Sequence, residues 1–157
     1  MRVSQNKDRI DTLLTKGLAD LSMTLAVLAR IDNNNYEIVA VQSNSGAYVP
    51  GEKYELGASY SRETFELQQI IAVTSIEDAT RTLRHPLYRS LPLASYLGAP
   101  IEVDGKPWGC LDFSSLAHRD EAFDKQDLQL IESLADEISQ LLNSMELPAP
   151  KSNSNAQ

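Results

Sequence analysis

The first part of the chain carries a helical pattern of apolar and polar positions. Apolar side chains recur there at spacings of three and four residues, with charged and polar residues between them. The recurring positions are Ile10, Leu13, Leu14, Leu18 and Leu21. Because a helix places such positions on one side, the pattern predicts an amphipathic helix with a single apolar stripe.

Two strand-like segments follow this helix. Residues 24–30 are largely apolar, and residues 36–42 are rich in β-branched and aromatic side chains. An Asp-Asn-Asn-Asn run at 32–35 lies between them, and these residue types tolerate the left-handed backbone of tight turns. The pattern predicts a β-hairpin, and residues 43–56 are expected to form a loop after it.

The middle of the chain is less regular. A short helix is expected at about residues 59–68, with Ser59 or Ser61 as its N-cap, because a Ser hydroxyl can accept a hydrogen bond from the first turn. Residues 70–73 predict a brief buried strand. Two prolines interrupt residues 75–93, and the mixture of Arg, His and Tyr there favours short helical turns over one face of a sheet.

A second hairpin gives the clearest pattern in the chain. Residues 96–103 and 108–114 are strand-like and are joined around Asp104-Gly105, a dipeptide typical of tight hairpin turns. We therefore expect these two strands to lie side by side in the sheet.

The last predicted element is a long helix from Lys125 to about Met145. Asp124 is expected to be its N-cap, and Phe123 and Leu128 are placed to close a hydrophobic staple across the helix start.

Strands that are neighbours in sequence and joined by tight turns form an antiparallel sheet. The expected fold class is therefore α/β of the α+β type, with a central antiparallel sheet of about five to six strands. The N- and C-terminal helices cover one face of that sheet, and short helices and loops cover the other. One domain is expected over residues 1–146, followed by a flexible tail at 147–157 that is rich in Pro, Ser and Asn.

Composition narrows the class of partner. The chain has 157 residues, 42% of them apolar, which suits one domain with a real core. Its 22 acidic against 14 basic residues give a net charge of −8, which repels nucleic acids and anionic lipid headgroups. No secretory signal is visible at the N-terminus, and no run approaches the ~20 apolar residues of a membrane helix. We expect a cytoplasmic protein that binds neither nucleic acid nor membrane.

Three segments bear a family resemblance. Residues 96–115, with the sequence YLGAPIEVDGKPWGCLDFSS, closely resemble the last hairpin of GAF domains, and residues 36–41 and 123–127 also look like that family. GAF domains are small-molecule sensing modules found in cyclic-nucleotide phosphodiesterases, phytochromes and bacterial signalling proteins. The resemblance covers roughly residues 8–145. It implies a ligand cavity between the sheet and the middle helices, and it does not name the ligand.

The known ligands of GAF domains fit the sequence poorly. Cyclic-nucleotide binders carry an Asn-Lys pair after the last hairpin strand, where this chain has Ser114 and Ser115, and an Asp-Glu pair four residues after a Phe. Here Phe123 and Asp127 match, but Leu128 replaces the Glu. The matching part is what helix capping alone would select. The resemblance therefore does not predict cyclic-nucleotide binding.

Tetrapyrroles are disfavoured for a different reason. A covalently bound bilin needs a cysteine on the helical side of the pocket, whereas Cys110, the only cysteine, lies in a predicted strand. His118 lies in a polar loop, which is a poor place for an axial haem ligand. A single cysteine also excludes an internal disulfide and a thiolate zinc site. No cofactor and no metal are expected.

One enzymatic alternative belongs to the same family. Free methionine sulfoxide reductases are GAF domains, and their chemistry resolves a sulfenic acid through further cysteines. A chain with one cysteine cannot complete that cycle internally. The sequence also lacks a phosphate-binding glycine loop and a metal-spaced His/Cys cluster. It therefore predicts a protein that is not an enzyme, with no catalytic residues, and the reductase stays an alternative.

Candidate ligand contacts come from the last predicted strand and the segment before it. Side chains alternate along a strand, so the apolar Leu111 and Phe113 are expected to face the terminal helices and the mixed row the cavity. Asp112 is either a polar anchor for a ligand amine or hydroxyl, or a residue at a sheet edge or bonded to loop backbone. For the aromatic candidates, ordinary packing is the competing interpretation. The candidate ligand-binding residues are His85, Tyr88, Tyr96, Trp108, Cys110, Asp112 and Ser114.

The last predicted helix carries two apolar rows. One row is enough to cover the sheet, so the second either pairs with a partner's helix or lies deep in the same domain. The first alternative predicts a homodimer, because apolar side chains beyond the sheet would need a second chain to cover them. The candidate interface residues are Leu13, Leu14, Leu142 and Met145.

Together these observations predict a stand-alone sensory or regulatory domain of bacterial style. It would bind a small ligand or a partner signalling protein and pass the change on, in trans, through its terminal helices. A pure interaction or dimerisation module with a vestigial cavity is the first alternative, and the reductase is the second.

Overall fold

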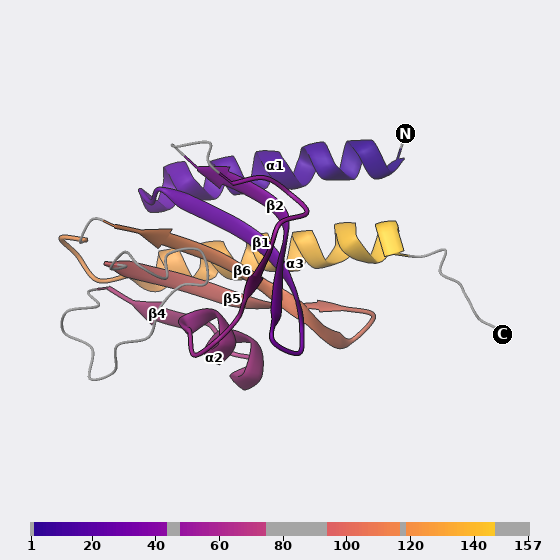
Figure 1. Ribbon diagram of the computed structural model, residues 1–157. Coiled ribbons are helices and arrows are strands. Elements are labelled where there is room, and N and C mark those ends of the chain that lie inside the picture. The colour runs from indigo at the N-terminus through magenta and orange to yellow at the C-terminus, as the bar shows by residue number, and fades with distance from the viewer. Residues whose placement is uncertain (1, 44–47, 75–93, 117–118, 147–157) are drawn as a thin grey trace, which may run out of the picture.

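A computed structural model of the chain describes residues 2–43, 48–74, 94–116 and 119–146. In this part of the chain, three helices and six strands form an α+β fold (Figure 1). The elements are α1 (Arg2–Leu21), β1 (Leu25–Asp32), β2 (Asn35–Ser43), β3 (Lys53–Glu55), α2 (Tyr60–Leu67), β4 (Ile71–Val73), β5 (Ser95–Val103), β6 (Lys106–Ser115) and α3 (Lys125–Glu146).

The sheet has six strands in the order β3-β2-β1-β6-β5-β4. Every neighbouring pair is antiparallel, as the tight predicted turns require. Asp104 and Gly105 both have positive φ (58° and 74°) at the turn between β5 and β6, the backbone that tight hairpin turns need. The predicted fold class is confirmed.

The terminal helices α1 and α3 lie side by side on one face of the sheet and run in opposite directions (Figure 1). Their apolar stripes and the facing sheet residues form one core. Leu111, which was expected to face these helices, is buried there together with Leu97, Ala99 and Ile101 of β5. Gly17 lets α1 approach the sheet closely, because an added Cβ would lie only 2.6 Å from Cε1 of Phe113.

The two predicted helix starts have the expected caps. The Ser59 hydroxyl accepts a hydrogen bond from the backbone N–H of Arg62 at 3.1 Å, so Ser59 is the N-cap of α2 and Ser61 is not. Before α3, each of Asp124 and Asp127 accepts a hydrogen bond from the other's backbone N–H, at 2.9 and 3.0 Å. This reciprocal arrangement satisfies two backbone donors that helix geometry leaves free.

One element differs from the sequence prediction, and two predicted segments are not tested. The predicted loop over 43–56 contains a short strand, β3, which pairs with residues 35–37 of β2. Its Lys-Tyr-Glu sequence lacks the apolar alternation of a strand, and it forms because the edge of β2 supplies partners. The helical turns predicted for residues 75–93 and the tail at 147–157 lie outside the described residues.

A β-bulge changes the face of the sheet on which the Trp108 side chain lies. Ile101 pairs with Gly109 and Glu102 pairs with Pro107, so Trp108 is an extra residue without a cross-strand partner. Such a bulge interrupts the alternation of side chains along a strand. Trp108 packs against the core on the α1–α3 side. The expectation that it shares a face with the polar residues that follow it on β6 is therefore wrong.

The apolar rows of the terminal helices are buried within one chain. Leu13, Leu14 and Leu142 are at most 2% exposed, and Met145 is half-buried against the same core. The two helices pack on each other as well as on the sheet, so α3 uses both its rows internally. Burial within one chain leaves Leu13, Leu14 and Leu142 little surface for a partner, which favours the alternative of a deeply embedded helix. Met145 keeps part of its surface, and the homodimer stays a prediction.

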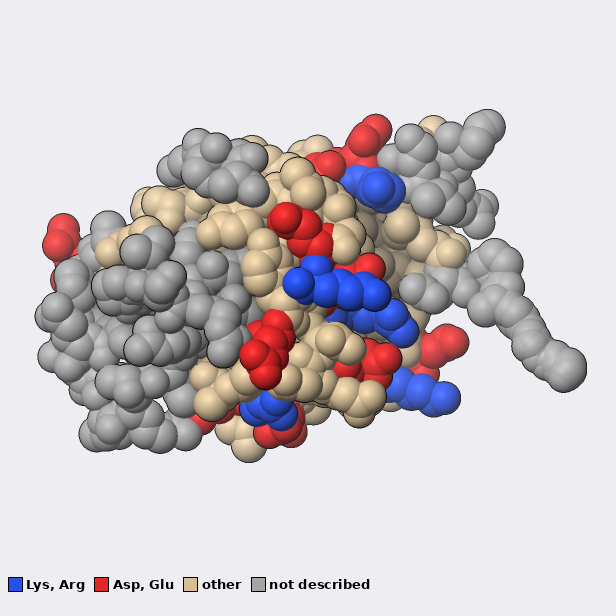
Figure 2. All heavy atoms as spheres, in the orientation of Figure 1, with Lys and Arg blue, Asp and Glu red and all other residues tan. Residues whose placement is uncertain are grey.

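The described surface mixes charges of both signs. On the face in view, Figure 2 shows Lys and Arg side chains interleaved with Asp and Glu side chains. Ion pairs of this kind include Arg62 with Glu66 (3.0 Å) and Arg9 with Glu137 (2.8 Å), the latter joining α1 to α3. None of the helices in the described ranges is long and apolar enough to span a membrane.

Candidate functional site

A buried carboxylate lies at the centre of the sheet, on the face opposite to α1 and α3. Asp112 is in the middle of β6, between Val27 of β1 and Gly98 of β5, and its side chain is fully buried. Its oxygens accept hydrogen bonds from three hydroxyls on three different elements. The donors are Tyr36 on β2 (2.8 Å), Ser61 on α2 (2.7 Å) and Tyr96 on β5 (2.5 Å).

These hydroxyls replace the water molecules that would solvate an exposed carboxylate. Burying a charged group is costly unless hydrogen bonds replace its hydration. Hydrogen bonds to an ionised acceptor are also stronger than those between neutral groups. Asp112 therefore ties β2, β5 and α2 to the centre of the sheet.

A second layer of contacts extends the network into α2. The Thr64 hydroxyl lies 2.9 Å from the Tyr96 hydroxyl and donates to the backbone carbonyl of Tyr60, also at 2.9 Å. The Tyr60 and Tyr96 rings stack, with centroids 5.5 Å apart and an angle of 27° between their planes. The buried face of α2 is thus joined to β5 by a hydroxyl pair and by an aromatic contact.

Gly98 makes room for this arrangement. It is the cross-strand partner of Asp112, and the ring of Tyr96, two residues earlier on the same face, folds over it. A Cβ at Gly98 would overlap the Tyr96 hydroxyl and would lie 2.6 Å from Cζ of that ring. Only a residue without a side chain lets Tyr96 reach the carboxylate.

The tyrosine hydroxyls and the cysteine thiol around Asp112 are held in their protonated forms. Burial, and then the nearby Asp112 carboxylate, raise the pKa of Tyr36 and of Tyr96 well above the usual value. The same two causes raise the pKa of the Cys110 thiol, and a hydrogen bond from Ser61 opposes them only in part. The hydroxyls are therefore available as donors, and Cys110 is a poor nucleophile because the thiolate is the reactive form.

One buried hydroxyl on this face, that of Ser114, lacks a hydrogen-bond partner among the described residues. Ser114 is two residues beyond Asp112 on β6, pairs with Leu25 and Tyr96 of the neighbouring strands, and is fully buried. Among the residues that the structure describes, its Oγ has no hydrogen-bond partner. An unpaired buried hydroxyl is unfavourable, so this position favours a water or ligand group that completes it.

The structure brings together four of the seven candidate ligand residues. Tyr96, Cys110, Asp112 and Ser114 lie close together on the face opposite to α1 and α3. Trp108 packs on the other side. The two remaining candidates, His85 and Tyr88, lie outside the described residues.

Three members of the network were not predicted from the sequence. The sequence places Tyr36 only in a strand, Ser61 only in or at the cap of the short helix, and Thr64 only within that helix. A pattern was present: Ser61 and Thr64 are three residues apart in a short helix and so share its face. That spacing indicates a polar helix face, but not that the face is buried.

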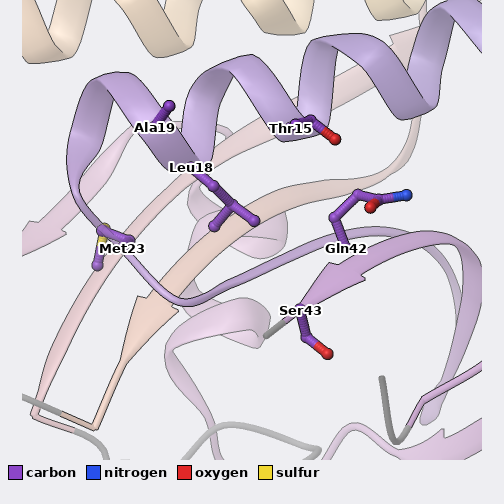
Figure 3. Close-up of a pocket in the computed structure, with 6 residues that line it drawn as sticks. All are labelled: Thr15, Leu18, Ala19, Met23, Gln42 and Ser43. Atoms are coloured by element: carbon purple, nitrogen blue, oxygen red, sulfur yellow. The ribbon is translucent and has the colours of Figure 1, made fainter. Parts of the chain in front are cut away.

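A separate pocket lies on the helix side of the sheet. It has a volume of about 320 Å³ and is lined by residues of α1, the turn after it and the end of β2. The lining residues are Thr15, Leu18, Ala19, Met23, Gln42 and Ser43. Figure 3 shows Leu18 and Gln42 at the gap between α1 and β2. Across the described ranges, no group of three His, Cys, Asp or Glu side chains is placed to hold a metal ion.

Comparison with known families decides the class. Residues 10–142 match the GAF domain family, which is most of the chain. The chain belongs to the GAF domain family. No curated protein matches it.

Solved GAF domains share the whole architecture. The GAF domain of an Acinetobacter phosphoenolpyruvate-protein phosphotransferase superposes with a TM-score of 0.75 at 15% identity, covering 95% of this chain and 92% of that chain. The GAF domain of PixJ from Thermosynechococcus elongatus gives 0.72 at 20% identity, with 92% and 88% covered. A type II free methionine-R-sulfoxide reductase from Thermoplasma acidophilum gives 0.70 at 15% identity, with 92% and 96% covered. These identities show the fold, and GAF domains are mostly sensory and signalling modules.

Proposed function

We propose that this GAF domain is a sensory module that binds a small ligand at the hydroxyl cluster around Asp112 and Ser114. The single observation that carries the proposal is the chemistry of the sheet's two faces. The face under α1 and α3 is an apolar core, whereas the centre of the other face holds a carboxylate and several hydroxyls. Apolar side chains often stabilise a fold as well as a buried polar network does, so stability alone does not require this network.

The residues present favour a ligand with hydroxyl or amine groups. Ser114 Oγ can donate to or accept from such a group, and Asp112 is an acceptor for any donor that displaces one of its present partners. Tyr96 lies between these two residues and can supply an aromatic wall. Binding would therefore use Tyr96, Cys110, Asp112 and Ser114, the candidates that the structure brings together.

β6 supports a route from this site to the terminal helices. Asp112 faces the ligand side, and Phe113, the next residue, faces the other side, where its ring contacts α1 at Gly17. Leu134 of α3 lies at the same point, 3.1 Å from where a Gly17 Cβ would be. Any shift of β6 at Asp112 moves Phe113 against both helices, and a partner protein that contacts them would receive the change.

The chemistry of Cys110 supports a sensor over a thiol-dependent reductase. The thiol is fully buried and its raised pKa keeps it protonated. Catalytic cysteines have lowered pKa values and partial exposure. We therefore expect no turnover of free methionine sulfoxide by the purified protein.

The test is a thermal-shift screen against hydroxylated and amine-bearing metabolites, with native mass spectrometry of the purified protein. A ligand is expected to raise the Tm of the wild type, and Ser114→Ala is expected to weaken its binding about tenfold or more. Ser133→Ala, an exposed position on α3, is the matched control and should bind like the wild type. Equal binding by Ser114→Ala would place the ligand elsewhere, and no binding by any compound would favour the interaction module over the sensor.

A further inference from the structure

We propose that α2 is a gate: it undocks from the sheet as a unit and so admits the ligand to Asp112 and Ser114. The inference rests on the proposed function and adds how the site is reached. Tyr96, Asp112 and Ser114 are fully buried, so a ligand cannot contact them while the described arrangement holds. Some covering element has to move before binding.

The side chains that α2 buries are well suited to reversible docking. They are Tyr60, Ser61 and Thr64, and each carries a hydroxyl. The apolar contacts of α2 are fewer: the Tyr60 ring stacks on Tyr96, and the half-buried Phe65 packs against apolar residues of β1 and β2. Ser61 donates to Asp112, and Thr64 is bonded to Tyr96. Water or a ligand can replace a hydroxyl in such bonds, whereas nothing in water replaces an apolar contact.

The terminal helices are docked in the opposite way. Ile10 and Leu14 of α1, and Ile131 and Ile138 of α3, are at most 1% exposed in the apolar core. Opening at these helices would expose that core to water, which is the most unfavourable step in unfolding. Separation at α2 is therefore the lower-energy opening of the two.

The backbone at the two ends of α2 suits a movement of the helix as a body. Gly57 precedes it with φ 59°, and Gln68 ends it in the left-handed conformation with φ 52°. The start of the helix is tethered, because Arg62 donates to the carbonyl oxygen of Gly57 (2.5 Å) and to Oδ1 of Asn34 (2.6 Å). We infer that α2 pivots about this tethered end, and that the Thr64 contact opens before the Ser61 contact, which lies nearer to the tether.

The chain carries its own reporter for this opening. Cys110 is its single cysteine, it is fully buried, and its Sγ lies 3.4 Å from Asp112, the carboxylate that Ser61 of α2 covers. An aromatic disulfide reagent such as 5,5′-dithiobis(2-nitrobenzoate) reacts with this thiol only when it is exposed. The labelling rate, measured without any ligand, therefore reports how often the α2 face opens.

The variant that tests the gate is Thr64→Val, with Thr12→Val as its matched control. Both threonines donate to the carbonyl oxygen four residues earlier, at 2.9 and 3.0 Å, but only Thr64 also contacts a side chain on the sheet. Thr64→Val is expected to speed Cys110 labelling about tenfold, which corresponds to about 1.4 kcal/mol. Thr12→Val should stay within about twofold of the wild type.

The wild type alone gives a second measurement, should Thr64→Val fail to fold. Its labelling rate at low urea is expected to be nearly independent of urea, as for a local opening, and to rise steeply only near global unfolding. Amide hydrogen exchange in residues 60–67 should be faster than in α1 and α3 and should rise with Thr64→Val. A labelling rate that follows global unfolding at every urea concentration would overturn the gate. Equal effects of the two variants, or an equal rise in α3 exchange, would do so too.

These outcomes separate the gate from the proposed function, because none of the measurements uses a ligand. Local opening with no ligand in any screen leaves the gate and removes the sensor. Ligand binding by a protein in which Cys110 is labelled only on global unfolding leaves the sensor and removes the gate.

Discussion

Replacing Gly98 by alanine tests the geometry of the site most directly. The added Cβ would overlap the Tyr96 hydroxyl, so the ring has to leave its position over Gly98. That movement breaks the bond from Tyr96 to Asp112 and the bond between Tyr96 and Thr64. Gly98→Ala is therefore expected to destabilise the protein although it adds only one methyl group.

The size of the effect follows from these contacts. A hydrogen bond to a charged group contributes about 1.5–3 kcal/mol, and one between neutral groups about 0.5–1.5 kcal/mol. Overpacking adds about 1–3 kcal/mol, and the lower backbone entropy of alanine in the unfolded chain returns about 0.4–1 kcal/mol. We expect a net loss of about 2–7 kcal/mol, a large part of the ~5–15 kcal/mol that holds a domain folded.

Urea unfolding followed by far-UV circular dichroism measures this loss, and a double-mutant cycle assigns its cause. Tyr96→Phe removes the hydroxyl that the new methyl group would displace, so Gly98→Ala should cost less in that background, by about 1.5 kcal/mol or more. Gly105→Ala is the control, since φ is +74° there and no atom lies within 4 Å of its Cβ. It should cost only about 1–2 kcal/mol of backbone strain. Additive effects in the cycle, or a Gly98→Ala cost no larger than that of Gly105→Ala, would refute the proposed position of Tyr96.

Two further predictions concern pH and the junction of the terminal helices. Tyr36, Tyr96 and Cys110 have raised pKa values in the folded state, so they ionise at lower pH in the unfolded chain than in the folded protein. The stability that they contribute is therefore complete below their ordinary pKa values and is lost as the pH rises through their pKa values in the folded state. Urea midpoints should fall above about pH 8.5, because the free energy of unfolding decreases there by up to about 1.4 kcal/mol per pH unit for each group. Tyr36→Phe should make this decrease shallower. An unchanged slope would contradict the buried position of that hydroxyl. Arg119 donates to the carbonyl oxygen of Leu21 at 2.6 Å, at the end of α1, and its guanidinium lies 4.1 Å from the centroid of the Phe123 ring, just before α3. Arg119→Lys should lower the free energy of unfolding in urea by about 1–2 kcal/mol at both low and high salt, because a lysine cannot reproduce the planar contact. An effect seen only at low salt would show that Arg119 acts merely as an exposed surface charge.

Local sequence determined most of the secondary structure of this protein. The stripe from Ile10 to Leu21, the turn at Asp104-Gly105 and the cap at Asp124 each depend on residues within one or two turns of one another. Such patterns act before any tertiary contact forms, which is why they predict elements reliably. The antiparallel sheet followed from them, because tight turns leave adjacent strands no other way to pair.

Tertiary structure alone decided the rest. The bulge that turns Trp108 toward the helices depends on the pairing of β5 with β6, and the burial of Leu142 depends on how α1 packs against α3. A one-residue shift in register reverses every side chain that follows, so alternation cannot predict facing across a bulge.

The Asp112 site shows the same limit most clearly. Its partners Tyr36, Ser61 and Tyr96 lie 76, 51 and 16 residues away in the chain, and no local pattern connects them. The sequence offered Asp112 as a polar residue in a buried strand and left its partners open. Only the folded sheet, with Gly98 opposite and α2 above, brings the donors within hydrogen-bonding distance, because burying a carboxylate depends on groups that chain folding alone can gather around it.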